Sequence, residues 1–172
     1  MSTIVLIDTS VLLNILDVPG YNQDKATIDN QYKQHIQNRD RLLLPMATIL
    51  ETGSHIADIR NGKQRRDWGE IFVNLVKQTQ RGDAPWSPLP FPDLECILTW
   101  IDEFPDFVSR GIAVGGGQVN QWKAAGFADL TIIKDWKKQC ELHRMTRVMI
   151  WSLDNGLQGY DRASSESPCR NR

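Results

Sequence analysis

A fully apolar run that ends in a carboxylate limits the possible folds of this chain more than any other feature. Residues 4–14 read IVLIDTSVLLN, in which four apolar residues precede Asp8, Thr9 and Ser10. An apolar run without polar alternation predicts a strand buried on both faces, as in parallel sheets that helices cover. Apolar residues then resume at helical spacing, which predicts a helix over 9–17. The carboxylate at the inner end of the strand therefore requires an explanation.

Two more short apolar runs predict strands at 41–45 and 147–153, and the second is followed by Asp154. Between the strands, the apolar spacing predicts helices over 24–37, 48–59, 64–80, 93–103 and 127–143. Strands that alternate with helices favour an α/β sandwich with a central parallel sheet.

Two segments carry no clear periodicity. RGDAPWSPLPFPD has four prolines between positions 85 and 92, which predicts a rigid connector and no regular element. The glycine-rich stretch over 109–126, with GGG at 115–117, predicts an irregular segment, either a mobile loop or a short helix–loop connection. We expect one domain over 1–162, with an insertion at about 82–126, and a flexible polar tail over 163–172.

Composition excludes several classes of protein. The chain has 172 residues and a net charge of −1, which argues against a bulk polybasic binder. Its three cysteines, Cys96, Cys140 and Cys169, form no CxxC pair, so we expect reduced thiols. With no visible signal peptide and no apolar run of about 20 residues, we expect a soluble cytoplasmic protein without membrane contact.

Four acidic residues share one predicted location. Asp8 and Asp154 follow parallel strands, Glu51 lies in the first turns of the helix after the second strand, and Asp129 opens the helix before the third. In parallel sheets, ligands bind at the carboxyl ends of the strands. Carboxylates gathered there repel one another and raise each other's pKa values, so a cation is needed. Oxygen ligands without His or Cys favour Mg²⁺ or Mn²⁺, which can activate water against a phosphodiester.

Each acid also has a structural interpretation when taken alone. Asp8 is a favoured helix N-cap, and Asp129 complements a helix dipole. Glu51 could be a solvated surface residue, and Asp154 with Asn155 and Gly156 could form a plain turn. Only the common location of the four favours a metal site.

Four stretches resemble, in order, the motifs of the PIN domain, a family of Mg²⁺- or Mn²⁺-dependent nucleases. They are IVLIDTSVLLNIL, LLLPMATILETGSHI, GFADLTIIKDW and VMIWSLDNGLQGY, and together they span residues 3–160. The resemblance implies a PIN-like three-layer α/β/α sandwich. It implies that Asp8, Glu51, Asp129 and Asp154 are the catalytic and metal-binding acids. It also assigns supporting roles to Ser10, Ser152, Thr9 and Asn14.

The chain departs from the compact toxin-type members of that family in two ways. Asp129 lies 78 residues after Glu51, a longer gap than those members have, and the inserted segment could be a substrate lid or a surface for a partner. After Asp154 the sequence predicts no clear closing strand. By resemblance, stand-alone members are most often toxins, which implies an antitoxin partner and makes a homodimer plausible.

Two basic groups are candidates for RNA contact, since Lys and Arg supply phosphate contacts. Either group could instead be an ordinary solvated helix surface. Their members are Arg60, Lys63, Arg65 and Arg66 in one group, and Lys134, Lys137 and Lys138 in the other. Trp86 and Trp122 could stack on bases but are better explained as exposed packing anchors. His55 lacks a second histidine partner and is interpreted as structural or surface-exposed.

These observations predict a metal-dependent endoribonuclease of the PIN class that is the toxin of a toxin–antitoxin pair. A haloacid-dehalogenase-like phosphatase is disfavoured, because it needs a second aspartate two residues after the first, where this chain has Ser10. The other alternative is a catalytically inactive PIN-like scaffold that binds RNA or protein. The four acids count against it, because a scaffold has no use for their repulsion.

Overall fold

The structure is a computed structural model that describes residues 2–113, 122–123 and 125–164. In chain order the elements are β1 (Ile4–Ile7), α1 (Thr9–Ile15), α2 (Lys25–Gln37), β2 (Arg41–Leu44), α3 (Met46–Ala57), α4 (Gly62–Arg81), β3 (Trp86–Pro88), α5 (Leu94–Arg110), β4 (Ile112–Ala113), β5 (Trp122–Lys123), α6 (Phe127–Leu142), β6 (Val148–Trp151), α7 (Asn155–Gln158) and β7 (Asp161–Arg162).

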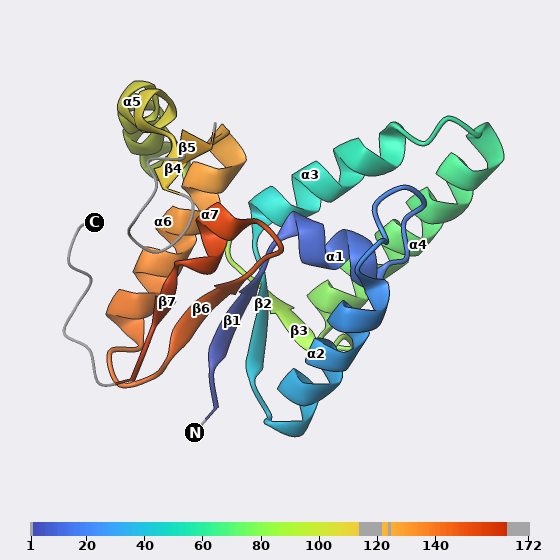
Figure 1. Ribbon diagram of the computed structural model, residues 1–172, viewed down its shortest axis with the longest axis horizontal. Coiled ribbons are helices and arrows are strands. Elements are labelled where there is room, and N and C mark those ends of the chain that lie inside the picture. The colour runs from blue at the N-terminus through green and yellow to red at the C-terminus, as the bar shows by residue number, and fades with distance from the viewer. Residues whose placement is uncertain (1, 114–121, 124, 165–172) are drawn as a thin grey trace.

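The central sheet has the strand order β3-β2-β1-β6-β7. β1 lies in the middle and pairs in parallel with both β2 and β6, with Leu6 opposite Leu43 on one side and Ile150 on the other. Helices cover both faces of this sheet, α6 on one side and α1, α2 and α4 on the other (Figure 1). The expected α/β/α sandwich with a central parallel sheet is therefore confirmed.

Alternate residues of β1 supply the two halves of the core. Val5 and Ile7 pack with the helices α1, α2 and α4, whereas Ile4 and Leu6 pack with α6. All four side chains are buried, with at most 4% exposed. Burial on both faces is what an apolar run without alternation predicts.

The proline-rich segment contains a strand, so its prediction as a connector was wrong. Trp86, Ser87 and Pro88 pair in parallel with β2 at the edge of the sheet. An edge strand tolerates proline because one side of its backbone needs no partner in the sheet. The predicted insertion therefore contributes to the central sheet.

The chain also closes the sheet after Asp154, contrary to expectation. A short helix, α7, is followed by β7, which pairs antiparallel with β6 through Asp161 and Arg162. The guanidinium of Arg162, which is 4% exposed, donates to the backbone carbonyls of Cys140, His143 and Thr146. These contacts fix the end of α6 against the new edge strand.

Two further differences lie between α5 and α6. Helix α5 continues through Pro105 to Arg110, beyond its predicted end at 103. Part of the expected irregular loop forms a small antiparallel pair, Ile112–Ala113 with Trp122–Lys123. The glycine run at 115–117 and most of the predicted tail lie outside the described residues. Within the described ranges, no helix is long and apolar enough to cross a membrane.

Candidate active site

Asp8 lies where β1 gives way to α1, and the local sequence explains its position. Its backbone N–H donates to the carbonyl of Trp151 (3.0 Å), which extends the pairing of β1 with β6 by one residue. Its side chain caps α1 and is 8% exposed. Two serine hydroxyls donate to Asp8 Oδ2, Ser10 Oγ at 2.6 Å and Ser152 Oγ at 2.8 Å. The carboxylate is therefore held in one orientation at the carboxyl end of the central strand.

Asp154 lies at the carboxyl end of the neighbouring strand, as the N-cap of α7. Its Oδ1 accepts from the backbone N–H of Gly156 (2.9 Å). Its own backbone N–H donates to Ser152 Oγ (2.8 Å), the hydroxyl that also donates to Asp8. One serine therefore positions both aspartates.

Glu51 reaches the same edge of the sheet from α3. That helix is anchored at its start, because the buried Thr48 hydroxyl donates to the carbonyl of Ile7 (2.7 Å). One turn later Glu51 Oε2 accepts from Thr9 Oγ1 at 2.7 Å. Thr9, which follows Asp8 directly, thus connects the first two acids.

Asp129 enters from the opposite side, in the first turn of α6. Its Oδ2 accepts from the backbone N–H of Gly126 (2.7 Å) and so caps the helix. Burial raises the pKa of Asp129 above its ordinary value, and the Gly126 hydrogen bond opposes this rise. The negative charges of Glu51, Asp8 and Asp154 raise that pKa further. The four acids are therefore electrostatically coupled.

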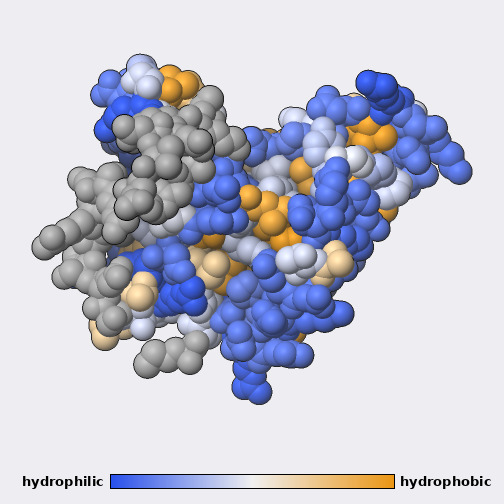
Figure 2. Space-filling model, viewed as in Figure 1, coloured by the Kyte–Doolittle hydropathy of each residue, from blue (hydrophilic) through white to orange (hydrophobic). Residues whose placement is uncertain are grey.

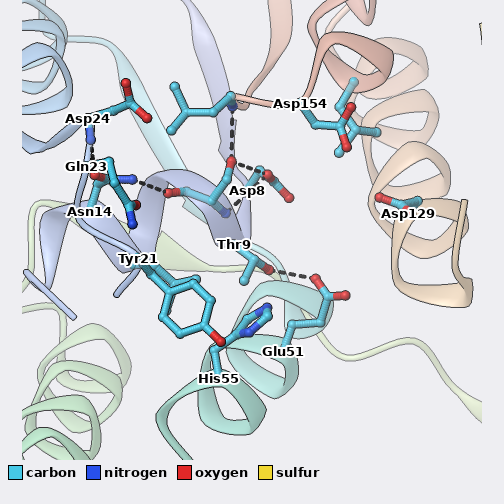
Figure 3. Close-up of a pocket in the computed structure, with 14 residues that line it drawn as sticks. Asp8, Thr9, Asn14, Tyr21, Gln23, Asp24, Glu51, His55, Asp129 and Asp154 are labelled. Carbon is cyan, nitrogen blue, oxygen red and sulfur yellow. Dashed lines mark hydrogen bonds between the residues drawn. The ribbon is translucent and has the colours of Figure 1, made fainter. Parts of the chain in front are cut away.

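The four carboxylates line one cleft of about 390 Å³ between α1, α3, α6 and α7 (Figure 3). Among the described residues that line the cleft, none is a lysine or an arginine. In Figure 2 hydrophobic residues show between α1 and α7, within a surface that is otherwise mostly hydrophilic. The lining residues are Asp8, Thr9, Ser10, Leu13, Asn14, Tyr21, Gln23, Asp24, Glu51, His55, Asp129, Leu153, Asp154 and Leu157.

The chemistry of this donor set fits a hard divalent cation. All four charged ligand candidates are carboxylates, the groups that Mg²⁺ and Mn²⁺ prefer. In the part of the chain that the structure describes, no three His, Cys, Asp or Glu side chains are grouped closely enough to hold one ion.

The supporting residues of the sequence analysis fall into two groups. Ser10, Ser152 and Thr9 each donate to a carboxylate of the cleft. Asn14, which is buried, instead bonds to the backbone: its amide donates to the carbonyl of Ser10 and accepts from the N–H of Asp24. Asn14 therefore holds the α1–α2 loop in place, whereas the other three residues orient candidate metal ligands.

The structure does not bring the predicted RNA-contacting residues into the cleft. Those at 60–66 are exposed around the start of α4, where Arg66 pairs with Glu70. On α6, Lys134 pairs with Glu103 of α5. Trp86 is 7% exposed and donates to Thr79 Oγ1 (2.7 Å), so it is a core residue and offers no stacking surface. The side chain of Trp122 lies outside the described part.

Sequence reasoning missed one side of the cleft. Tyr21, Gln23 and Asp24 come from the loop between α1 and α2, and His55 comes from α3. His55 was interpreted as structural or surface-exposed, yet it lines the cleft and its ring lies against Tyr21. One signal was available: His55 follows Glu51 by four residues, and positions i and i+4 share a helix face.

Comparisons with known proteins bear on the fold. No protein-family model and no curated protein matches the sequence. A similar solved structure is the crystal structure of FitAcB from Neisseria gonorrhoeae, with 18% sequence identity and a TM-score of 0.53. The match covers 91% of this chain and 92% of that one. At this identity the likeness concerns the fold alone, and the fold is PIN-like.

Proposed function

We propose that this protein is a Mg²⁺- or Mn²⁺-dependent endoribonuclease that hydrolyses RNA phosphodiester bonds. The observation that carries the proposal is the convergence of Asp8, Glu51, Asp129 and Asp154 on one cleft without a compensating basic side chain in its described lining. A fold has no structural reason to keep such repulsion. A divalent cation bound among the carboxylates would attract all four and so offset their mutual repulsion.

The residues have distinct parts in this proposal. Asp8, which accepts hydrogen bonds from Ser10 and Ser152, is the central ligand. Glu51 and Asp154 close the site from α3 and α7, and Asp129 closes it from α6. When bound, the ion supplies activated water and stabilises charge on the phosphoryl oxygens. Thr9 holds the Glu51 carboxylate in place through its hydroxyl.

RNA would reach the cleft across a surface with both acidic and basic groups. The exposed group of Arg60, Lys63, Arg65 and Arg66 lies where α3 passes into α4, in an arm of two helices that projects away from the sheet (Figure 1). This arm is suited to contact phosphates distant from the cut site. Lys134 is held by Glu103, so among the α6 lysines we assign phosphate contact to Lys137 and Lys138.

We further propose that the protein is the toxin of a toxin–antitoxin pair. The PIN-like fold and the likeness to FitAcB over most of both chains support this proposal. An antitoxin partner and a homodimer remain predictions that the resemblance to the PIN family implies. Copurification with an antitoxin tests the first prediction. The mass of the purified protein in solution tests the second.

The first experiment is cleavage of total RNA in Mg²⁺ and in Mn²⁺, with wild type, Asp8→Asn and Asp29→Asn. Asp29 is an aspartate of α2 that pairs with Lys25 and does not line the cleft, so it is the matched control. The proposal expects metal-dependent cutting by wild type and Asp29→Asn only. Cutting that survives Asp8→Asn, or that persists in EDTA, contradicts it.

A catalytically inactive PIN-like scaffold is the second candidate. The open arrangement of the described carboxylates, in which no three are grouped around one position, favours it. Mn²⁺ binding separates the two functions. A scaffold without a metal site has the same melting temperature with and without Mn²⁺, whereas a nuclease is stabilised by the ion it uses.

A further inference from the structure

The cleft continues past the carboxylates into a part of different chemistry. Tyr21, Gln23 and His55 line it on the side away from Asp129 (Figure 3). None of these three side chains is an acid, although Asp24, from the same loop as Tyr21 and Gln23, also lines the cleft on this side. The cleft therefore joins an acidic part to an aromatic part within a volume of about 390 Å³. That volume falls within the range of about 300–1,000 Å³ that is usual for small-ligand sites.

Tyr21 is held in place by a well-anchored loop. Val18, which precedes it, is fully buried in a cluster with Leu13 and Ile56, and the Tyr21 side chain packs against this cluster. The Tyr21 backbone N–H donates to the carbonyl of Val18 (3.0 Å). At the end of the loop, Asp24 N–H donates to Asn14 Oδ1 (3.0 Å). The aromatic ring is thus presented by a fixed backbone.

His55 completes an aromatic pair with Tyr21. The ring centroids lie 4.7 Å apart, at an interplanar angle of 52°. His55 Nδ1 is buried, and it has no hydrogen-bond partner among the described residues. A histidine kept for packing alone normally has its buried ring nitrogen bonded, because an unmet hydrogen bond costs stability. His55 Nδ1 would gain the missing hydrogen bond if the ring rotated toward a polar group of a ligand.

We propose that Tyr21 and His55 form a binding subsite for one unpaired base of an RNA strand, beside the position of the scissile phosphate. Aromatic rings bind splayed-out bases of single-stranded RNA by stacking, and adjacent polar groups read their edges. The carboxylates with their metal take the phosphate, and the aromatic pair takes the base. This inference rests on the proposed nuclease function, and it names unpaired RNA as the substrate class.

The test measures base recognition without cleavage. Isothermal titration calorimetry compares the four ribonucleoside monophosphates with ribose 5-phosphate, which shares their sugar and phosphate but has no base. Titrations are run in Mg²⁺ and in EDTA, with wild type, Tyr21→Leu, Tyr21→Phe and His55→Leu. Phe91→Leu is the matched control, because Phe91 is 65% exposed and does not line the cleft.

In wild type, at least one nucleotide should bind more tightly than ribose 5-phosphate by about 5- to 150-fold, the range of one base stacked on an aromatic ring. Tyr21→Leu should abolish this ratio, whereas Tyr21→Phe and Phe91→Leu should retain it. His55→Leu should change the order of preference among the four bases. Circular dichroism establishes that each variant is folded, and Tyr21→Phe guards against a loss caused by altered packing.

Two results overturn the subsite: equal affinity for nucleotides and ribose 5-phosphate in folded wild type, or a base preference that survives Tyr21→Leu. Either result leaves the carboxylate site and its cleavage assay untouched. Conversely, a Tyr21-dependent base preference in a protein that never cuts RNA supports the subsite and rejects the nuclease. The two proposals therefore fail separately.

Discussion

Ser152 Oγ donates to Asp8 Oδ2 at 2.8 Å, which joins the carboxyl ends of two neighbouring strands across 144 sequence positions. The same hydroxyl accepts from the backbone N–H of Asp154. Ser10 repeats this arrangement, since it donates to Asp8 and accepts from the N–H of Leu153 (3.0 Å). Each serine thus bridges the Asp8 carboxylate and the loop that carries Asp154. The two aspartates form one positioned unit.

Ser152→Ala should therefore weaken both the fold and the metal site. Its loss removes a buried donor to a carboxylate and an acceptor for a backbone N–H, which should lower the free energy of unfolding by about 1–3 kcal/mol. Mn²⁺ should also bind more weakly, because Asp8 is less well oriented. Urea unfolding and a Mn²⁺ titration measure the two effects. Ser87→Ala, an exposed serine of β3, is the control, and equal losses in both variants would contradict the prediction.

Divalent metal should stabilise the protein through the cleft carboxylates. At a Mn²⁺ concentration of about 100 times the dissociation constant, binding to the folded state alone adds about 2.7 kcal/mol to the unfolding free energy. Glu51→Gln should lose most of this gain, since it removes one charged ligand. Glu70→Gln on α4, where Glu70 pairs with Arg66, should keep it. Thermal melting with and without Mn²⁺ measures the effect. If Mn²⁺ raised the melting temperature of Glu51→Gln as much as that of wild type, the result would count against the site.

The shared location of the acids could be predicted because it depends on topology rather than on side-chain detail. The apolar run of residues 4–7 allows only a doubly covered strand, and all four side chains are buried. Parallel strands that alternate with helices then place Asp8 and Asp154 at one edge of the sheet. The neighbouring ends of α3 and α6 follow from the same connectivity.

The parts that could not be predicted depend on tertiary contacts of a few residues. β3 and β7 have three and two residues, and strands this short exist only because β2 and β6 offer unpaired edges. Trp86 gave no sign of burial, since its neighbours are prolines and small residues. Tyr21 reaches the cleft through the path of the α1–α2 loop, which local sequence does not determine.

Asp129→Asn should make the metal-free protein more stable. Burial and the charges of three other carboxylates raise the pKa of Asp129, which means that its ionised form is unfavourable in the folded state. An asparagine oxygen can still accept from Gly126 N–H and so retains the helix cap. Asp129→Ala relieves the same repulsion but loses the cap, at a cost of about 0.5–2 kcal/mol.

Unfolding in EDTA at neutral pH compares wild type, Asp129→Asn and Asp129→Ala. Asp129→Asn is expected to be more stable than both wild type and Asp129→Ala. In Mn²⁺ the advantage of Asp129→Asn should shrink or reverse, because the ion then compensates the carboxylate in wild type. An Asp129→Asn protein that is less stable than wild type in EDTA would show that the carboxylate stabilises the fold by more than burial and repulsion cost.

Asp135, one and a half turns further along α6, should make stability depend on pH independently of the cleft. Burial raises the pKa of Asp135 to about 6 from an ordinary value of 3.8, and Lys138 only partly offsets this. The folded state therefore holds this proton more tightly than the unfolded chain does. As a result, the contribution of Asp135 to the unfolding free energy decreases as pH rises from about 4 through about 6.

Asp135→Asn removes this dependence, because the amide does not titrate. Relative to wild type, the variant should gain stability between pH 4.5 and pH 7.5 by about 1–3 kcal/mol, in line with a pKa difference of about two units between the folded and unfolded states. Urea unfolding across this range measures the difference. Glu141→Gln, an exposed acid of the same helix, should track wild type at every pH. A constant offset between Asp135→Asn and wild type would instead assign the effect to packing, since only a titrating carboxyl group changes its contribution with pH.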